Sequence, residues 1–144
     1  MAYKGKFRPS IPKKYRGDYT NIIYRSLWEL KFMKYCDREP NIIEWISEPF
    51  PISYYLPTDK KWHRYYPDFL VKTRTKDNQH KITMIEIKPE KQTKPPTRGK
   101  KKRKTILNEQ KTWVMNQNKW KFAERFCKKR GIEFKILTEK ELLI

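Results

Sequence analysis

Four short segments between residues 42 and 88 constrain the fold of this chain more than any other feature. Each is rich in β-branched and aromatic residues, and the segments are separated by Pro, Asp and Asn, which favour turns. They span residues 42–46, 51–56, 64–72 and 81–88. This pattern predicts a meander of strands in the middle of the chain.

Helical periodicity flanks these strands. Apolar residues recur at three- and four-residue steps over residues 23–36, which predicts a largely buried helix. A second helix is expected from near Ile106 to the basic residues before Gly131, a residue suited to a helix C-cap. Residues 132–136 alternate as a strand, and the capping-box spacing that starts at Thr138 predicts a last short helix. The order of helix, strands, helix, strand and helix indicates an α/β domain.

The charge balance indicates the class of partner. The 144 residues include 35 Lys and Arg against 16 Asp and Glu, a net charge of +19. Such an excess needs a polyanionic partner or counterions to offset self-repulsion. Nucleic acid is the obvious candidate, and an anionic membrane is the rival. No apolar run reaches the roughly 18 residues of a transmembrane span, and the basic N-terminus lacks the apolar segment of a signal peptide. We therefore expect a soluble intracellular protein that binds DNA and no membrane.

The cations concentrate in two segments. Residues 1–20 read as an extended basic arm, and residues 21–144 read as a single domain with a mobile basic loop at 89–105. The predicted DNA-contacting cations of the arm are Lys13, Lys14 and Arg16, and those of the loop are Lys91, Lys94, Arg98, Lys100, Lys101, Lys102, Arg103 and Lys104. Their alternative interpretation is a solvated charge run, but residues 91–104 contain eight cations without one acid, which exceeds what solubility requires. Phosphate contacts of this kind predict binding that is largely independent of sequence.

Three tryptophans are candidates for contact with unpaired bases. Trp45, Trp62 and Trp113 could stack on bases, or they could pack in the core, which is the more frequent fate of tryptophan.

Two of the predicted strands contain the candidate catalytic residues. Asp68 follows Pro67 in one, and Glu86 and Lys88 share one side of the other because side chains alternate along a strand. Phosphodiester hydrolysis needs a hard cation, which carboxylate oxygens bind, and a lysine that orients or deprotonates the attacking water. Taken singly, each feature has a plainer explanation, since Asp after Pro is common at turns and Glu-x-Lys is common on exposed faces. Together they favour a nuclease.

Glu29 is a fourth candidate, because it lies on a largely apolar helix surface. A carboxylate there requires a partner. It could complete a metal site from the first helix, or it could form an ion pair with Arg25 one turn earlier.

These motifs, in this order, resemble those of PD-(D/E)XK nucleases. The resemblance implies a restriction-endonuclease-like core, in which a central mixed β-sheet is flanked by helices. It also implies that Asp68, Glu86 and the backbone carbonyl of Ile87 hold Mg²⁺, or alternatively Mn²⁺, with help from Glu29. Some branches of the superfamily add a glutamine on the following helix, where Gln110 stands, although a solvated helix position explains that residue equally well.

A narrower resemblance is to the head completion nucleases of T-even-like tailed phages. The matching stretches are Met1-Ala2-Tyr3, Lys14-Tyr15-Arg16-Gly17-Asp18, Tyr24-Arg25-Ser26, Glu86-Ile87-Lys88-Pro89, Lys129-Arg130-Gly131-Ile132 and Ile136-Leu137-Thr138-Glu139. The resemblance implies a protein that trims or cleaves packaged DNA late in capsid assembly so that the filled head can join a tail. Such a protein would act in the host cytoplasm, or reside in the virion head, beside head or portal-vertex proteins. The alternatives are a non-catalytic DNA-end-binding head protein and a transposon end-cutting endonuclease subunit.

Overall fold

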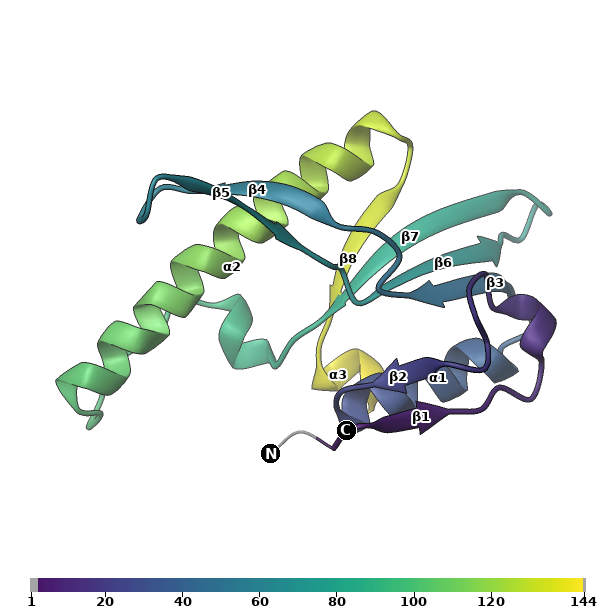
Figure 1. The fold of residues 1–144 in the computed structure, drawn as a ribbon, viewed down its shortest axis with the longest axis horizontal. Coiled ribbons are helices and arrows are strands. Elements are labelled where there is room, and N and C mark those ends of the chain that lie inside the picture. The colour runs from purple at the N-terminus through teal and green to yellow at the C-terminus, as the bar shows by residue number, and fades with distance from the viewer. Residues whose placement is uncertain (1–2, 144) are drawn as a thin grey trace.

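A four-stranded mixed sheet forms the centre of the computed structural model, which describes residues 3–143 (Figure 1). In spatial order its strands are β3 (Ile42–Ser47), β6 (Phe69–Arg74), β7 (His80–Ile87) and β8 (Glu133–Leu137). The first two pairings are antiparallel, and β7 pairs with β8 in parallel. The predicted α/β fold with a central mixed sheet is confirmed.

Helices and two small hairpins cover the sheet. One side carries α1, the short α3 and the β1–β2 ribbon, whereas the other carries the long α2 and the β4–β5 hairpin. Their bounds are β1 Gly5–Phe7, β2 Ile22–Tyr24, α1 Leu27–Arg38, β4 Ile52–Leu56, β5 Lys61–Tyr65, α2 Arg103–Lys129 and α3 Glu139–Leu142, with 3-10 turns η1 Pro12–Lys14 and η2 Glu90–Thr93. Among residues 3–143, no helix combines the length and apolar character that crossing a membrane requires.

Strand alternation on β7 divides the hydrophobic core in two. Ile85 and Ile87 pack into the cluster beneath α1, together with Phe69 of β6. Met84 packs instead into the cluster beneath α2 and the β4–β5 hairpin. Because successive side chains point to opposite faces, Glu86 is directed to the α2 side of the sheet.

The N-terminal segment differs from the predicted extended arm. Residues Gly5–Phe7 pair with Ile22–Tyr24, so the helix expected over residues 23–36 begins only at Leu27, after the N-cap Ser26. The buried carboxylate of Asp37 accepts hydrogen bonds from the backbone of Ser10 (2.8 Å) and Ile11. These contacts hold the segment against α1.

Lys14 is not available for the phosphate contact that was predicted. Its side chain is buried, and Nζ donates to the carbonyls of Asp37 (3.2 Å) and Glu39 (2.9 Å). Lys13 and Arg16 are exposed, although Arg16 lies 3.6 Å from a carboxylate oxygen of Glu44. The three predicted DNA-contacting cations of this segment therefore divide into one that holds the fold and two that face solvent.

Two further element boundaries differ from the prediction, and one predicted helix cap is confirmed. The strand predicted over residues 64–72 is interrupted between Tyr65 and Phe69, since Pro67 has no N–H for a ladder. Helix α2 starts at Arg103 rather than near Ile106, which places part of the predicted loop in a helix. The capping box of α3 is confirmed, since the Thr138 N–H donates to Glu141 Oε1 at 2.7 Å.

Candidate active site

Asp68 and Glu86 face one another across two neighbouring strands. The antiparallel register pairs Phe69 with Ile85, so continuing it by one residue sets Asp68 opposite Glu86. Directly opposed residues have Cβ atoms about 4.5–5.5 Å apart. Asp68 lies just before β6 rather than inside it, and two hydrogen bonds fix it there. Its Oδ2 accepts from the Ile87 N–H (2.7 Å), and its carbonyl accepts from the Glu48 N–H (2.9 Å).

Both carboxylates are poorly solvated. Glu86 is only 5% exposed, and its Oε1 has no hydrogen-bond partner among residues 3–143. Burial raises the pKa of Glu86, and Lys88 opposes that rise. Asp68 keeps some exposure at a cavity mouth, but burial and the charge of Glu86 raise its pKa also. Two opposed carboxylates with an unsatisfied oxygen form a site that favours a cation.

Lys88 follows the end of β7, and its backbone is held by β8. Its N–H donates to the Leu137 carbonyl at 3.0 Å. Lys88 lines a cavity of about 560 Å³ together with Asp68, Ile87 and Glu29. Its charge lowers the pKa of both Asp68 and Glu86. The predicted convergence of the Lys88 charge on the two carboxylates is therefore present in the structure.

Glu29 does not form the ion pair with Arg25 that was one of its two interpretations. Arg25 precedes α1 and donates from Nε to Glu48 Oε1 at 2.7 Å. The Glu29 carboxylate accepts from the Ser26 hydroxyl at 3.2 Å, and burial followed by repulsion from Asp68 raises its pKa. Glu29 therefore lies on the same cavity as Asp68, on the wall formed by the start of α1.

The donor set fits a metal that needs few protein ligands. Within residues 3–143, no group of three or more His, Cys, Asp or Glu side chains lies close enough to hold an ion. Mg²⁺ is commonly bound by one or two carboxylates plus water and substrate phosphate, so Asp68 and Glu86 suffice without Glu29. The unsatisfied Oε1 of Glu86 is consistent with this arrangement, because a buried carboxylate oxygen otherwise needs a donor.

Two residues of α2 complete the surroundings of Glu86 and were not identified in the sequence. The side chain of Trp120 lies beside Glu86, and its buried indole N–H lowers the pKa of the carboxyl, although that N–H forms no hydrogen bond within residues 3–143. Lys119 is half-buried, with Nζ 5.5 Å from the ring centroid of Tyr65. Burial and repulsion from Lys88 lower its pKa, while Glu86 and Asp68 oppose that shift. The only sequence signal was an Asn-Lys-Trp stretch on an apolar helix face, which is typical of many helices.

Gln110 and the tryptophans fall into different surroundings. Gln110 is exposed on the N-terminal half of α2, about three turns before Trp120, so the structure gives it the solvated position that was its alternative. Trp45 is buried in the core at 1% exposure. Trp62 is exposed on β5 and packs edge-on against Phe122, whereas Trp113 is partly exposed.

The cations of the predicted basic loop are all exposed. They are Lys91, Lys94, Arg98, Lys100, Lys101, Lys102, Arg103 and Lys104. Lys94 lies 3.3 Å from Glu90 Oε1, and Lys101 lies 2.7 Å from Glu109 Oε1. The other six form no ion pair within the described part of the chain, which leaves them free for phosphate.

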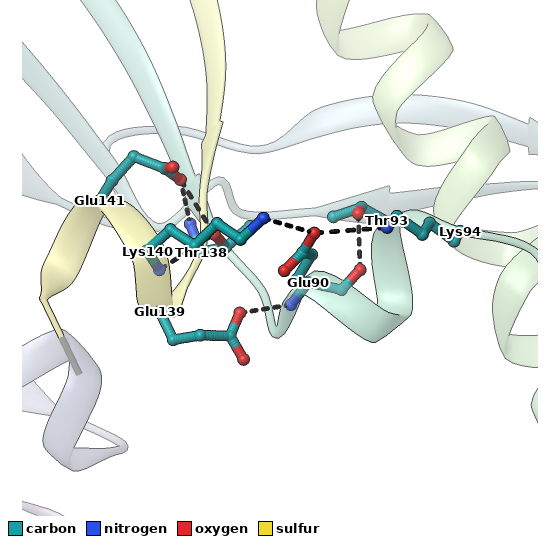
Figure 2. Close-up of polar contacts among 7 residues, drawn as sticks. All are labelled: Glu90, Thr93, Lys94, Thr138, Glu139, Lys140 and Glu141. Atoms are coloured by element: carbon teal, nitrogen blue, oxygen red, sulfur yellow. Dashed lines mark hydrogen bonds and ion pairs between the residues drawn. The ribbon is translucent and has the colours of Figure 1, made fainter.

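The C-terminal helix holds the segment that follows Lys88 (Figure 2). Glu139 of α3 accepts a hydrogen bond from the Glu90 N–H at 2.7 Å. Glu90 Oε1 in turn lies 3.0 Å from Lys140 Nζ and 3.3 Å from Lys94 Nζ. These contacts join η2 to α3. They fix the direction in which the backbone leaves Lys88 and enters residues 91–104, the basic segment.

Comparison with known proteins agrees with this geometry. The TnsA-like endonuclease N-terminal family model matches residues 39–139, a span that contains Asp68, Glu86 and Lys88. The head completion nuclease of Enterobacteria phage T4 is 44% identical over 145 residues, which cover 96% of this chain and 93% of that protein. An endonuclease family is in keeping with the restriction-endonuclease-like core that the motifs implied. The chain therefore belongs to the TnsA-like endonuclease N-terminal family.

Proposed function

We propose that this chain is a metal-dependent deoxyribonuclease whose catalytic centre is formed by Asp68, Glu86 and Lys88. The observation that carries the proposal is the pair of opposed carboxylates, one with an unsatisfied buried oxygen, beside two lysines. A buried anionic pair is costly to keep, and a cation that neutralises it offsets that cost.

Each residue has a role that its position supports. Asp68 and Glu86 would hold Mg²⁺, or alternatively Mn²⁺, with the Ile87 carbonyl as a further oxygen ligand. When bound, the metal lowers the pKa of a water and neutralises charge on the phosphate. Lys88 lies at the open cavity, where its ammonium group can orient the attacking water and stabilise negative charge on the phosphate. Lys119 approaches from α2 and adds positive charge where the phosphate becomes more negative.

The exposed cations of residues 91–104 support DNA as the substrate. Contacts from lysine and arginine to phosphate give affinity that is independent of sequence and falls steeply with salt. We therefore infer a nuclease that selects DNA by structure or by location rather than by sequence.

The similarity to a head completion nuclease supports a role in phage assembly. The match extends over nearly the full length of both proteins, which favours the same task over that of a transposon end-cutting subunit. In this role the protein would act in the host cytoplasm during assembly, trimming or cleaving packaged DNA beside head or portal-vertex proteins. The retained carboxylates favour an enzyme over a non-catalytic plug.

Cleavage of linear and closed circular duplex DNA, with Mg²⁺, Mn²⁺ or EDTA, tests the proposal. We expect metal-dependent cutting that Asp68→Ala and Lys88→Ala both abolish, with circular dichroism as the check on folding. Cutting of closed circles would add endonuclease activity. Salt-sensitive binding without cutting by the wild-type protein would favour the DNA-end-binding alternative instead.

A further inference from the structure

A second cavity, of about 440 Å³, lies between the basic segment and α2. Its volume falls within the range of small-molecule and cofactor sites and is far too small to admit a DNA duplex. Polar side chains and one tryptophan line both walls, among them Lys91, Gln92, Asn108, Trp113 and Asn116.

The wall formed by the basic segment is folded rather than loose. Lys101 Nζ donates to the Thr97 carbonyl at 3.0 Å and pairs with Glu109 of α2 at 2.7 Å. Arg98 Nε donates to the Lys101 carbonyl at 3.4 Å. At the other end, Glu90 is bound by α3, as described above (Figure 2). The segment is therefore anchored at both ends of the cavity.

The lining chemistry matches that of a nucleotide. Trp113 offers a partly exposed aromatic ring, and bases stack on such rings regardless of their identity. Asn116 is only 2% exposed and lines the cavity, so its amide can donate to and accept from a base edge. Lys91 is an exposed cation on the same cavity, suited to phosphate. Lys94 is also exposed there, but its ammonium pairs with Glu90 at 3.3 Å. The one acid, Glu109, is paired with Lys101.

The cavity adjoins the catalytic centre. Asn116 lies four residues before Trp120, which is about 6 Å along the helix on the same face. Trp120 is the residue beside Glu86. On the opposite wall, Lys91 follows Lys88 by three residues. A strand whose phosphate lies at Glu86 and Lys88 could therefore place a neighbouring nucleotide in this cavity.

We propose that this cavity binds one unpaired nucleotide of the DNA strand being cut, next to the scissile phosphate. The inference rests on the proposed nuclease function and narrows its substrate to DNA that has an unpaired stretch at the cleavage point. A fully paired base cannot enter, because the cavity has no room for its partner strand.

Binding of DNA that contains 2-aminopurine tests this inference without any cleavage. The protein, in EDTA, is titrated into a duplex with a short single-stranded overhang that carries the fluorescent base, and into a blunt duplex of equal length. We expect quenching on the overhang and at least about fivefold tighter binding of the overhang than of the blunt duplex. Trp113→Ala should remove both effects, whereas Trp62→Ala, which alters an exposed tryptophan on β5, should leave both unchanged.

A second variant and a competitor make the test decisive. Gln92→Ala changes a partly exposed lining residue, so it should fold, and it should reduce the preference for the overhang without changing affinity for blunt duplex. Equal affinities of wild-type protein for the two DNAs would overturn the inference, as would an equal effect of Trp62→Ala and Trp113→Ala. Displacement of the overhang by deoxyadenosine monophosphate at micromolar concentration would also overturn it, because the cavity would then serve free nucleotides. A preserved preference without cleavage under any condition would refute the proposed nuclease function, and with it the place of this cavity beside a scissile phosphate, but not the binding of an unpaired nucleotide in the cavity.

Discussion

The candidate active site and the basic segment of residues 91–104 differ in how their charged side chains are surrounded. In the centre, Asp68 and Glu86 are held by strand register and backbone hydrogen bonds, in surroundings that disfavour their charged forms. In the basic segment, eight cations are exposed and only Lys94 and Lys101 have an acidic partner within residues 3–143. Under the proposed function, cleavage would therefore depend on the position of a few side chains, whereas DNA affinity would depend on the number of exposed cations.

The largest effect is expected when the charge of Glu86 is removed and the shape of its side chain is kept. Glu86→Gln removes a metal-binding charge at a buried site, so we expect DNA cleavage to fall by at least about 10²-fold, the scale of losing one preorganised group. DNA binding in low salt should stay within about twofold. Glu29→Gln is the matched control, because Glu29 lies on the same cavity but is not needed for a two-carboxylate site. Equal losses in the two variants, measured as single-turnover rates, would contradict this assignment.

A smaller effect is expected at Lys119. Lys119→Met keeps an unbranched side chain at this half-buried position but removes the charge near Glu86, so cleavage should slow by about tenfold to 10²-fold. Lys121→Met, which removes an exposed charge two residues later, should have no effect on the single-turnover rate. A normal rate in Lys119→Met would remove Lys119 from the centre.

In the basic segment, the expected effect is on salt dependence rather than on rate. Replacing Lys100, Lys102 and Lys104 by Ala should reduce the slope of log K against log[salt] by roughly 0.9 for each DNA phosphate that these lysines neutralise in the wild-type protein. The cleavage rate at saturating DNA should be unchanged. A control triple variant at exposed positions elsewhere, Lys34, Lys76 and Lys129, has the same net charge. If both variants lower the slope equally, the basic segment has no special role in binding.

The smallest effect should appear in stability without metal. Burial raises the pKa of Asp68 from its unfolded value of 3.8 to about 7. The contribution of Asp68 to stability therefore decreases as pH rises from about 4 to about 7. Asp68→Asn removes this cost. In EDTA at pH 8 the variant should melt a few degrees above wild type, and the difference should shrink as pH falls toward 4. Mg²⁺ should raise the melting temperature of wild type alone. A variant that is less stable than wild type at pH 8 would indicate that Asp68 is held by partners rather than strained by burial.

The sequence predicted the part of the candidate site that depends on the alternation of side chains along a strand. Glu86 and Lys88 were expected on one side of a strand, and the structure brings both charges to Asp68. The opposition of Asp68 and Glu86 was not predictable from spacing, because register depends on the turn between β6 and β7. The apolar neighbours of Asp68 predicted that it lies inside a strand, but Pro67 interrupts that strand and Asp68 precedes β6.

The N-terminal segment and α2 contained the features that the sequence could not reveal. Residues 23 and 24 fell within the predicted helix because the partner strand of β2, Gly5–Phe7, lies far enough away in the chain to leave no local signal. Lys14 looked like one more cation of an arm, although its ammonium bonds to the backbone at the C-terminal end of α1. Lys119 and Trp120 entered the site through packing of α2 on β7, a long-range contact that no short motif records.

Isothermal titration calorimetry of Mn²⁺ into the metal-free protein tests the central claim that Asp68 and Glu86 together hold the catalytic cation. We predict a site in wild-type protein that weakens by at least about tenfold in both Asp68→Asn and Glu86→Gln, and by less in Glu29→Gln. The cleavage rate should rise with Mn²⁺ over the same concentrations that fill the site. Unchanged Mn²⁺ affinity in both the Asp68 and Glu86 variants, or full cleavage by wild-type protein in EDTA, would contradict the account.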